Sequence, residues 1–276
     1  MTRTHGKYIP TLGISDTSKN ITAFINHNYD EFWMIYRNLM PFIFGLQLLG
    51  ALIDTFFFPN STNFIFSETF HLMYLYFMGI WAINWHRLVI NGIDYTPMRI
   101  FKPKRNELIF MLIAVLLTVG SMAIFSAGIF IPLQSGVKAV WPYVLIMFGS
   151  FCVSFFILYR FSFYFPARAT NNPLTLMQAF HLSKGYIWNL FWSGFFASLK
   201  FMIILALLIT FRTIMEALFG IDKESHSPLM TFMLDSPITL FFEPMYTVIG
   251  ITALSNYYLY AMAHQKESYT NNDNPN

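Results

Sequence analysis

The stretch LIFMLIAVLLTVGSMAIFSAGIFIPLQSGV, at residues 108–137, contains no charged side chain and indicates the class of the protein. A helix needs about 20 consecutive apolar residues to cross the hydrocarbon core of a membrane. A second uncharged stretch, AVWPYVLIMFGSFCVSFFILY, follows at 139–159, with only Lys138 between the two. We therefore expect two consecutive membrane-spanning helices joined by a short turn.

The composition of the whole chain supports the same class. Of its 276 residues, 55% are hydrophobic and 11% are charged, whereas a soluble domain carries about 25% charged residues. So few charges exclude a soluble enzyme and a disordered chain. The net charge of +3 is too small to support nucleic-acid binding. The single cysteine, Cys152, cannot form an internal disulfide and is expected to be a small buried apolar side chain.

The length criterion predicts an all-α membrane protein with six transmembrane helices, arranged as three hairpins with interfacial amphipathic helices. Residues 1–37 form the expected N-terminal segment, residues 38–263 the transmembrane domain and residues 264–276 a polar tail. The six expected spans lie near 38–58, 66–87, 107–131, 139–163, 186–211 and 238–263.

Basic residues are distributed unevenly between the two ends of these spans. Thirteen of the 17 Lys and Arg residues lie before the first span, in or beside the loop between the second and third, in or beside the loop between the fourth and fifth, or after the last. Cytoplasmic segments of membrane proteins are enriched in Lys and Arg. We therefore expect both termini to lie in the cytoplasm.

Each hairpin is expected to begin with an interfacial segment. Residues 21–37, ITAFINHNYDEFWMIYR, place apolar side chains at helical intervals, which is typical of an amphipathic helix at a membrane surface. The segment PLTLMQAFHLSKG at 173–185 repeats this pattern. The more basic segment TPMRIFKPKRNE at 96–107 is a third candidate.

The predicted cytoplasmic loops resemble those of a bacterial protein family. The segments that carry the resemblance are WHRLVING at 85–92, RIFKPKRNEL at 99–108, RFSFYFPAR at 160–168, MQAFHLSKG at 177–185 and WNL at 188–190. They are similar to uncharacterised multi-span inner-membrane proteins related to the glycerophosphoryl diester phosphodiesterase membrane domain. In that family the second interfacial helix typically ends in Ser or Thr, Lys or Arg, and Gly, as Ser183, Lys184 and Gly185 do here. The resemblance implies a fold and a membrane but no activity.

The chain lacks the common sequence signatures of catalysis. It contains no His-Glu-x-x-His, no Gly-x-Ser-x-Gly, no Gly-x-x-x-x-Gly-Lys-Ser/Thr and no Cys-x-x-Cys. We therefore expect no enzymatic activity, no cofactor and no metal site.

Three charged residues of the predicted spans are candidates for an intramembrane polar site. Lys200 lies near the middle of the fifth span, Glu243 precedes Pro244 in the sixth, and Asp54 lies late in the first. A charge at mid-membrane is costly and normally faces a bundle interior or a wet cavity. An ion or proton path past these residues would indicate a small transporter or permease subunit. The alternative, which we favour, is that Lys200 extends to the interface or forms a single packing ion pair.

The basic residues of the predicted cytoplasmic loops are candidates for binding lipid head groups, because each contributes about 1 kcal/mol near an anionic surface. They also act as topology signals, and the two roles are compatible. The candidates are Arg99, Lys102, Lys104, Arg105, Arg160, Arg168 and Lys184.

Two smaller groups of residues carry predictions about packing. Trp81, Trp85 and His86 are expected to anchor the second span at the membrane interface. Gly120 and Gly128, in the third span, are expected to permit close contact with a neighbouring helix.

Taken together, these features predict a non-enzymatic membrane component: a scaffold or accessory subunit that engages membrane lipids or other membrane proteins. The transporter is the main alternative, and a membrane-embedded enzyme acting on lipid is a third. A water-filled, charge-lined cavity at mid-depth would favour transport, whereas a dry bundle with basic interfacial segments would favour the scaffold.

Overall fold

The computed structural model describes residues 8–58, 65–92, 95–100, 102–134, 140–172, 174–218, 236 and 238–272, and all regular secondary structure in them is helical. The ends of the predicted N-terminal segment and polar tail, residues 1–7 and 273–276, lie outside the described residues. The elements are α1 (Ile14–His27), α2 (Tyr29–Arg37), α3 (Met40–Phe57), α4 (Ile65–Asn91), α5 (Arg105–Gln134), α6 (Val140–Phe161), α7 (Tyr164–Ala169), α8 (Leu176–Leu182), α9 (Ile187–Leu218), the π-helical turn η3 (Ile238–Phe242) and α11 (Glu243–Asn272).

Among the described residues, four helical segments are long and apolar enough to cross a membrane: Met40–Phe57, Arg105–Phe130, Trp141–Ala169 and Ile187–Ile214. Only 6% to 22% of the most apolar window in each is buried inside the protein, so these windows present most of their surface to the surroundings. The prediction of an all-α membrane protein is therefore confirmed at this level. The remaining two predicted spans fall on α4 and α11, which are not among the four. Six crossings and their grouping into three hairpins stay predictions.

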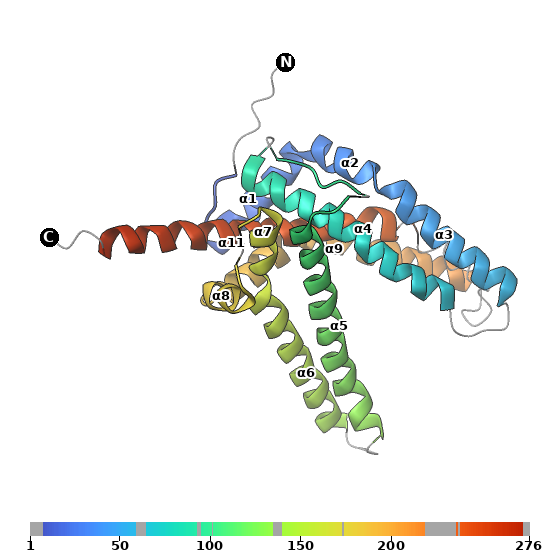
Figure 1. Ribbon diagram of the computed structural model, residues 1–276. Coiled ribbons are helices and arrows are strands. Elements are labelled where there is room, and N and C mark those ends of the chain that lie inside the picture. The colour runs from blue at the N-terminus through green and yellow to red at the C-terminus, as the bar shows by residue number, and fades with distance from the viewer. Residues whose placement is uncertain are drawn as a thin grey trace.

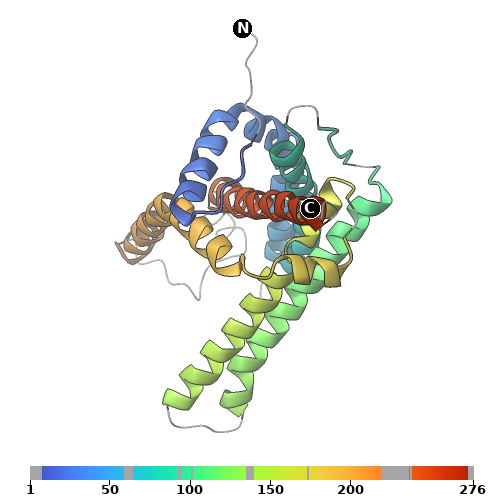
Figure 2. The same cartoon turned by 90° about the vertical axis from the view of Figure 1, so that its left-hand side faces the viewer.

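The helix α11 lies at the centre of the molecule, with α1, α4 and α9 packed around it (Figures 1 and 2). Its central position explains why it is less apolar than a lipid-facing helix. Thr252, Ser255 and Asn256 are fully buried in it, and each has a hydrogen-bond partner inside the protein. A buried polar group is tolerated when it is paired in this way.

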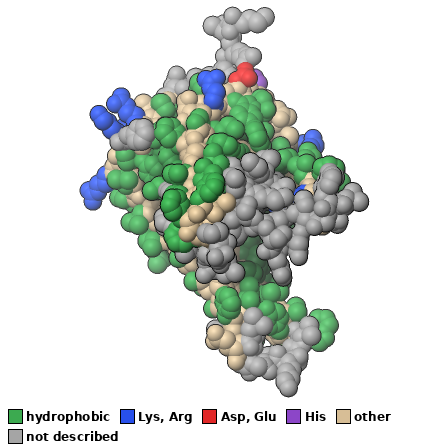
Figure 3. Space-filling model, turned by 90° about the vertical axis from the view of Figure 1, so that its right-hand side faces the viewer, with side chains coloured by type: hydrophobic (Ala, Val, Ile, Leu, Met, Phe, Trp, Pro, Cys, Tyr) green, Lys and Arg blue, Asp and Glu red, His purple; other side chains and the backbone are tan. Residues whose placement is uncertain are grey.

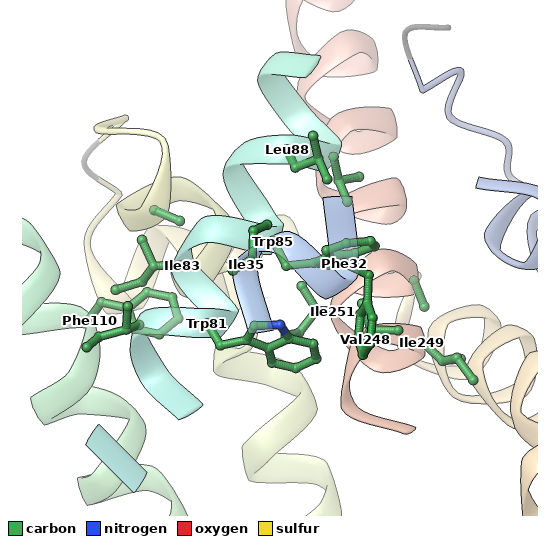
Figure 4. Close-up of a cluster of buried hydrophobic side chains, with 14 of the residues drawn as sticks. Phe32, Ile35, Trp81, Ile83, Trp85, Leu88, Phe110, Val248, Ile249 and Ile251 are labelled. Carbon is green, nitrogen blue, oxygen red and sulfur yellow. The ribbon is translucent and has the colours of Figure 1, made fainter. Parts of the chain in front are cut away.

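Aromatic side chains fill the core between α2, α4 and α11. Figure 4 shows Trp81 and Trp85 beside Phe32 and Val248, and all four are at most 1% exposed. The ring of Phe32 lies 5.7 Å from that of Trp81 and 6.0 Å from that of Trp85, edge to face in both cases. The prediction that Trp81, Trp85 and His86 anchor a span at the membrane interface is therefore wrong, because other helices enclose them.

The amphipathic helices at the N-terminus form as predicted, but their apolar faces contact other helices of the protein. A membrane surface had been expected there. Their apolar side chains, among them Ile21, Ile25, Phe32 and Ile35, are buried. Helix α1 packs on α9 and α11, and α2 packs on α4. The Tyr36 hydroxyl also donates to the Leu240 carbonyl at 2.8 Å. The apolar face of the predicted segment 21–37 is thus an internal interface.

The other two predicted interfacial segments have different outcomes. Helix α8 lies within 173–185 and begins with a capping box between Thr175 and Gln178. Gly185 follows it at φ +92°, a conformation that favours glycine. The described residues of 95–104 contain no helix. Pro97 and Pro103 explain this, because proline cannot donate to a helix and disfavours helical geometry in the residue before it.

Helices α5 and α6 run side by side and project away from the other helices (Figures 1 and 2). Gly128 makes this approach possible, since a Cβ added there would collide with the Ser150 hydroxyl on α6. The Ser154 hydroxyl donates to the Ser121 carbonyl at 3.0 Å. Gly120, in contrast, has no neighbour within 4 Å of such a Cβ. Cys152 lies on the outer side of this pair and is exposed, so its predicted burial is wrong.

Candidate lipid head-group site

A cavity of about 620 Å³ lies between α2, the turn that connects it to α3, α4 and the described residues of the segment 95–102. Two predicted lipid-binding cations, Arg99 and Lys102, line it, together with the side chains of Asn84 and Tyr95. The rest of its wall is mainly apolar and comes from Met34, Ile35, Leu39, Ile80, Pro97, Met98 and Ile100, with Asn38 at one edge. The cavity therefore combines a cationic rim with an apolar wall.

Hydrogen bonds from α4 hold the segment that carries the two cations. The backbone N–H of Met98 donates to Oδ1 of Asn84 at 2.7 Å, and both residues are buried. The Tyr76 hydroxyl donates to the carbonyl of Ile100 at 2.6 Å. Because these bonds fix the backbone on both sides of Arg99, the irregular segment has a defined position against α4.

Arg87, near the end of α4, connects α4 and the segment after it to α5 and α7. Its Nη2 forms an ion pair with Oε1 of Glu107 at 2.7 Å. Its Nε donates to the carbonyl of Ala169 at 2.7 Å, and its Nη1 donates to that of Thr96 at 3.1 Å. The backbone N–H of Lys104 donates to the other carboxylate oxygen of Glu107 at 2.6 Å. This arrangement pairs both buried charges, as their burial requires.

The electrostatics of the cavity favour an anionic guest. Arg99 and Lys102 are both exposed, so their charges are available at the rim. Burial, and secondly the nearby Glu31 carboxylate, raises the pKa of Tyr95 to about 12. The phenol is protonated at neutral pH, as it would be at its ordinary pKa of 10, and can donate to an oxyanion, while Glu31 adds one negative charge nearby. Figure 3 shows Lys and Arg side chains around the upper part of one face, above the projecting α5–α6 pair.

The other predicted lipid-binding cations occupy different places. Lys104, which precedes α5, and Arg105, which begins it, are exposed but do not line the cavity. Arg168 donates to Asn106 Oδ1 at 3.2 Å and to the Tyr164 hydroxyl at 3.0 Å, so it connects α7 to α5.

Arg160 and Lys184 lie apart from these residues, near the C-terminal end of α6. The Ser183 hydroxyl, next to Lys184, donates to the Arg160 carbonyl at 2.9 Å.

The three intramembrane candidates are not brought together. Lys200 is exposed on α9, whereas Asp54 is 1% exposed in α3. Glu243 begins α11, is exposed, and has its carboxylate close to the Tyr74 phenol of α4. Among the residues that the structure describes, no ion pair or hydrogen bond joins Lys200 to either carboxylate. The predicted kink at Pro244 coincides with the junction of η3 and α11.

The histidines and acidic residues also lack a common site. His86 is buried and forms a 2.8 Å hydrogen bond with the Ser255 hydroxyl. The side chain of His71 lies outside the described residues. Within the described part of the chain, no three His, Cys, Asp or Glu side chains are grouped so that they could hold a metal ion.

Sequence reasoning found the cations of the cavity but missed Asn84, Tyr76 and Tyr95. Asn84 carried the clearest signal, since a polar amide in the apolar run FMGIWAINW is unusual within a predicted span. The role of Tyr95 depends on how the segment after α4 folds back, and no local pattern indicates that path.

Comparisons with known proteins leave the family open. No family model, no curated protein and no solved structure matches the chain. The resemblance to the membrane domain of glycerophosphoryl diester phosphodiesterases therefore stays a prediction.

Proposed function

We propose that this protein is a non-enzymatic component of a bacterial inner membrane that binds anionic phospholipid at the cavity lined by Arg99 and Lys102. In this proposal the chain crosses the membrane six times with both termini in the cytoplasm, and it serves as a scaffold or accessory subunit for lipids or other membrane proteins. The observation that carries the proposal is the pairing of two exposed cations with an apolar wall in one cavity.

The chemistry of the cavity fits a lipid better than a soluble anion. A phosphate could accept hydrogen bonds from Arg99, Lys102 and the protonated phenol of Tyr95. The apolar wall of α2 and α4 would remain poorly matched with a small hydrophilic anion, but it suits the glycerol and upper acyl region of a phospholipid. Each cation contributes about 1 kcal/mol near an anionic surface. Removing both should therefore weaken binding by about thirtyfold.

Native mass spectrometry of the full chain in mild detergent tests the proposal. Phosphatidylglycerol and phosphatidylcholine with identical acyl chains are titrated in parallel. The wild type is expected to prefer phosphatidylglycerol, and the Arg99→Gln/Lys102→Gln variant should lose most of the preference that this site provides. The matched control is Lys104→Gln/Arg105→Gln, which removes the same charge from the same loop but leaves the cavity lining intact.

The two double variants distinguish lipid binding in the cavity from a general attraction between the basic loop and anionic lipid. If both lower the preference equally, the loop acts only through its net charge and the cavity is not a binding site. A wild type that binds the two lipids equally would also contradict the proposal. Transport along Lys200, Glu243 and Asp54 ranks second, because no described contact joins Lys200 to the other two residues.

A further inference from the structure

We infer a second lipid site, in which one acyl chain of an anionic phospholipid lies in an aromatic groove between α6 and α9 and its phosphate meets Arg160. This inference rests on the proposed function, since it concerns a protein that binds membrane lipids. It adds a site away from the Arg99 cavity and assigns a place to the acyl chain.

The groove is apolar throughout. Its volume is about 580 Å³, and α6 lines it with Phe148, Phe151, Cys152, Phe155 and Phe156. These residues recur at intervals of three and four, so they form one continuous face of the helix. Ile187, Trp188 and Phe191 of α9 line the opposite side. Phe148, Phe156 and Trp188 are each about half exposed or more, so the groove is open.

The length of the groove favours an acyl chain over a partner helix. Phe148 and Phe156 are eight residues apart, and a helix rises about 1.5 Å per residue, so the groove extends about 12 Å along α6. That is close to one leaflet, about half of the roughly 30 Å hydrocarbon core. A transmembrane helix from another chain would need a contact surface through both leaflets.

A cation lies against a residue at one end of this groove, although it does not itself line the groove. Arg160 lies one helical turn beyond Phe156, and its guanidinium carbon is 5.6 Å from the Phe156 ring and 4.0 Å from the Phe180 ring. Within the described residues, Arg160 has no carboxylate partner, and its Nε has no hydrogen-bond acceptor. Stacking between two rings orients the planar guanidinium but leaves its charge uncompensated.

The turn after α8 supplies a second cation beside the first. Ser183 holds the end of α6 by donating to the Arg160 carbonyl, and Lys184 follows it as an exposed side chain. Gly185 then lines the groove without a side chain. Both cations therefore adjoin residues that line the groove, Arg160 through Phe156 and Lys184 through Gly185. A phosphate held by them would be followed by an acyl chain along the aromatic rings.

The native cysteine provides the test, because Cys152 is the sole cysteine of the chain and lines the groove. The rate at which a fluorescent maleimide modifies Cys152 is measured in the full chain in mild detergent. Phosphatidylglycerol should slow the reaction more than phosphatidylcholine with the same acyl chains. Glycerol phosphate, which offers the same anion without a chain, should not slow it.

Two variants test the roles of Arg160 and Lys184. Arg160→Gln and Lys184→Gln should each reduce the protection by phosphatidylglycerol, by about fivefold in lipid concentration for one lost charge. Lys184 is exposed, so its variant keeps the test valid if Arg160→Gln does not fold. The Arg99→Gln/Lys102→Gln variant should retain full protection at Cys152, because its cavity is separate.

The possible results distinguish this inference from the proposed function. The groove site is overturned if phosphatidylglycerol does not protect Cys152, or if the protection is unchanged in both Arg160→Gln and Lys184→Gln. The cavity at Arg99 and Lys102 would still be supported in that case if Arg99→Gln/Lys102→Gln alone loses the preference for phosphatidylglycerol. If protection of Cys152 increases with protein concentration while the lipid concentration is constant, a second copy of the chain occupies the groove. That result would also overturn the inference. Protection by glycerol phosphate would identify a plain anion site and contradict the acyl chain.

Discussion

Arg87 and Glu107 form a buried ion pair with 2.7 Å between Nη2 and Oε1, and their side chains are 5% and 2% exposed. The pair joins the C-terminal part of α4 to the first turn of α5. The connecting segment carries Arg99 and Lys102, so this ion pair, together with the hydrogen bonds from Asn84 and Tyr76, helps to position the two exposed cations. It thereby links the stability of the fold to the geometry of the candidate site.

Breaking this ion pair should strongly destabilise the protein. Glu107→Gln leaves the Arg87 guanidinium buried without its counter-charge, and Arg87→Met does the same to the carboxylate. Loss of one partner of a buried pair costs about 3–5 kcal/mol. We expect a large fall in the midpoint of thermal unfolding in detergent for either variant.

An exposed cation provides the control for that experiment. Arg37→Met removes a positive charge from the end of α2, where the side chain is exposed, and should leave the midpoint almost unchanged. The double variant Arg87→Met/Glu107→Gln should be less destabilised than the sum of the single variants, because it leaves no buried charge without a partner. Strictly additive losses would show that the two charges do not stabilise each other.

The close approach of α5 and α6 should depend on Gly128 but not on Gly120. An alanine at 128 would force its Cβ against Ser150, whereas one at 120 would meet open space. Overpacking of this kind costs about 1–3 kcal/mol, while Gly to Ala within a helix gains up to about 1 kcal/mol. Gly128→Ala should lower the thermal midpoint, and Gly120→Ala should leave it equal or higher.

A compensating change sharpens this comparison. Ser150→Gly removes the group that an added Cβ would strike, so Gly128→Ala/Ser150→Gly should recover much of the lost stability. If Gly128→Ala and Gly120→Ala behave alike, the tight contact between α5 and α6 is not present in the membrane protein.

The positions of the long helices follow from apolar runs, and all six predicted ranges fall on long helices. Their environment was harder to predict. Trp81 and Trp85 would look the same in sequence whether they faced lipid head groups or a protein core, because aromatic residues are common in both places. Only the packing of α2 and α11 against α4 distinguishes the two, and that packing joins residues far apart in the chain.

The same limit applies to the candidate site. Its cations stand out in sequence because charged residues are scarce in this chain, so Arg99 and Lys102 were found. Asn84 and Tyr95 were not found, since their roles arise when a segment without a regular pattern folds back on α4. Long-range pairing of this kind has no periodic signal.

Asn256 should hold the N-terminal segment against the central helix. The backbone N–H of Thr11 donates to Oδ1 of Asn256 at 2.9 Å, and Nδ2 of Asn256 donates to the Thr11 carbonyl at 2.8 Å. Asn256→Leu removes both bonds: the Thr11 N–H loses its partner, at a cost of about 1–3 kcal/mol, whereas the Thr11 carbonyl still accepts from the Thr17 hydroxyl at 2.9 Å. Amide hydrogen exchange in the peptide around Thr11 should accelerate markedly.

Asn189 offers a matched control for this prediction. Its side chain reaches the same segment only through a 3.4 Å contact with the Leu12 carbonyl, so Asn189→Leu should change the exchange rate little. Equal acceleration in the two variants would mean that the amide pairing of Asn256 does not secure the segment.

The number of membrane crossings can be settled at Lys138 and Lys184. If all six predicted spans cross and the termini are cytoplasmic, Lys138 lies outside and Lys184 inside. If only the four most apolar segments cross, α4 does not carry the chain back to the cytoplasm. Lys138 then lies inside and Lys184 outside. The termini are cytoplasmic in both cases, so only internal positions discriminate between the two topologies.

Single cysteines at these positions, placed in a Cys152→Ser background, provide the measurement. On intact cells, a membrane-impermeant maleimide should label Lys138→Cys directly and Lys184→Cys only after permeabilisation. Lys19→Cys, on the exposed side of α1, should also require permeabilisation, and the Cys152→Ser parent should remain unlabelled. Direct labelling of Lys184→Cys with protection of Lys138→Cys would establish four crossings. It would also place both basic loops, with Arg99 and Lys102 in one and Lys184 in the other, on the outer face, because each loop would then follow an odd number of crossings.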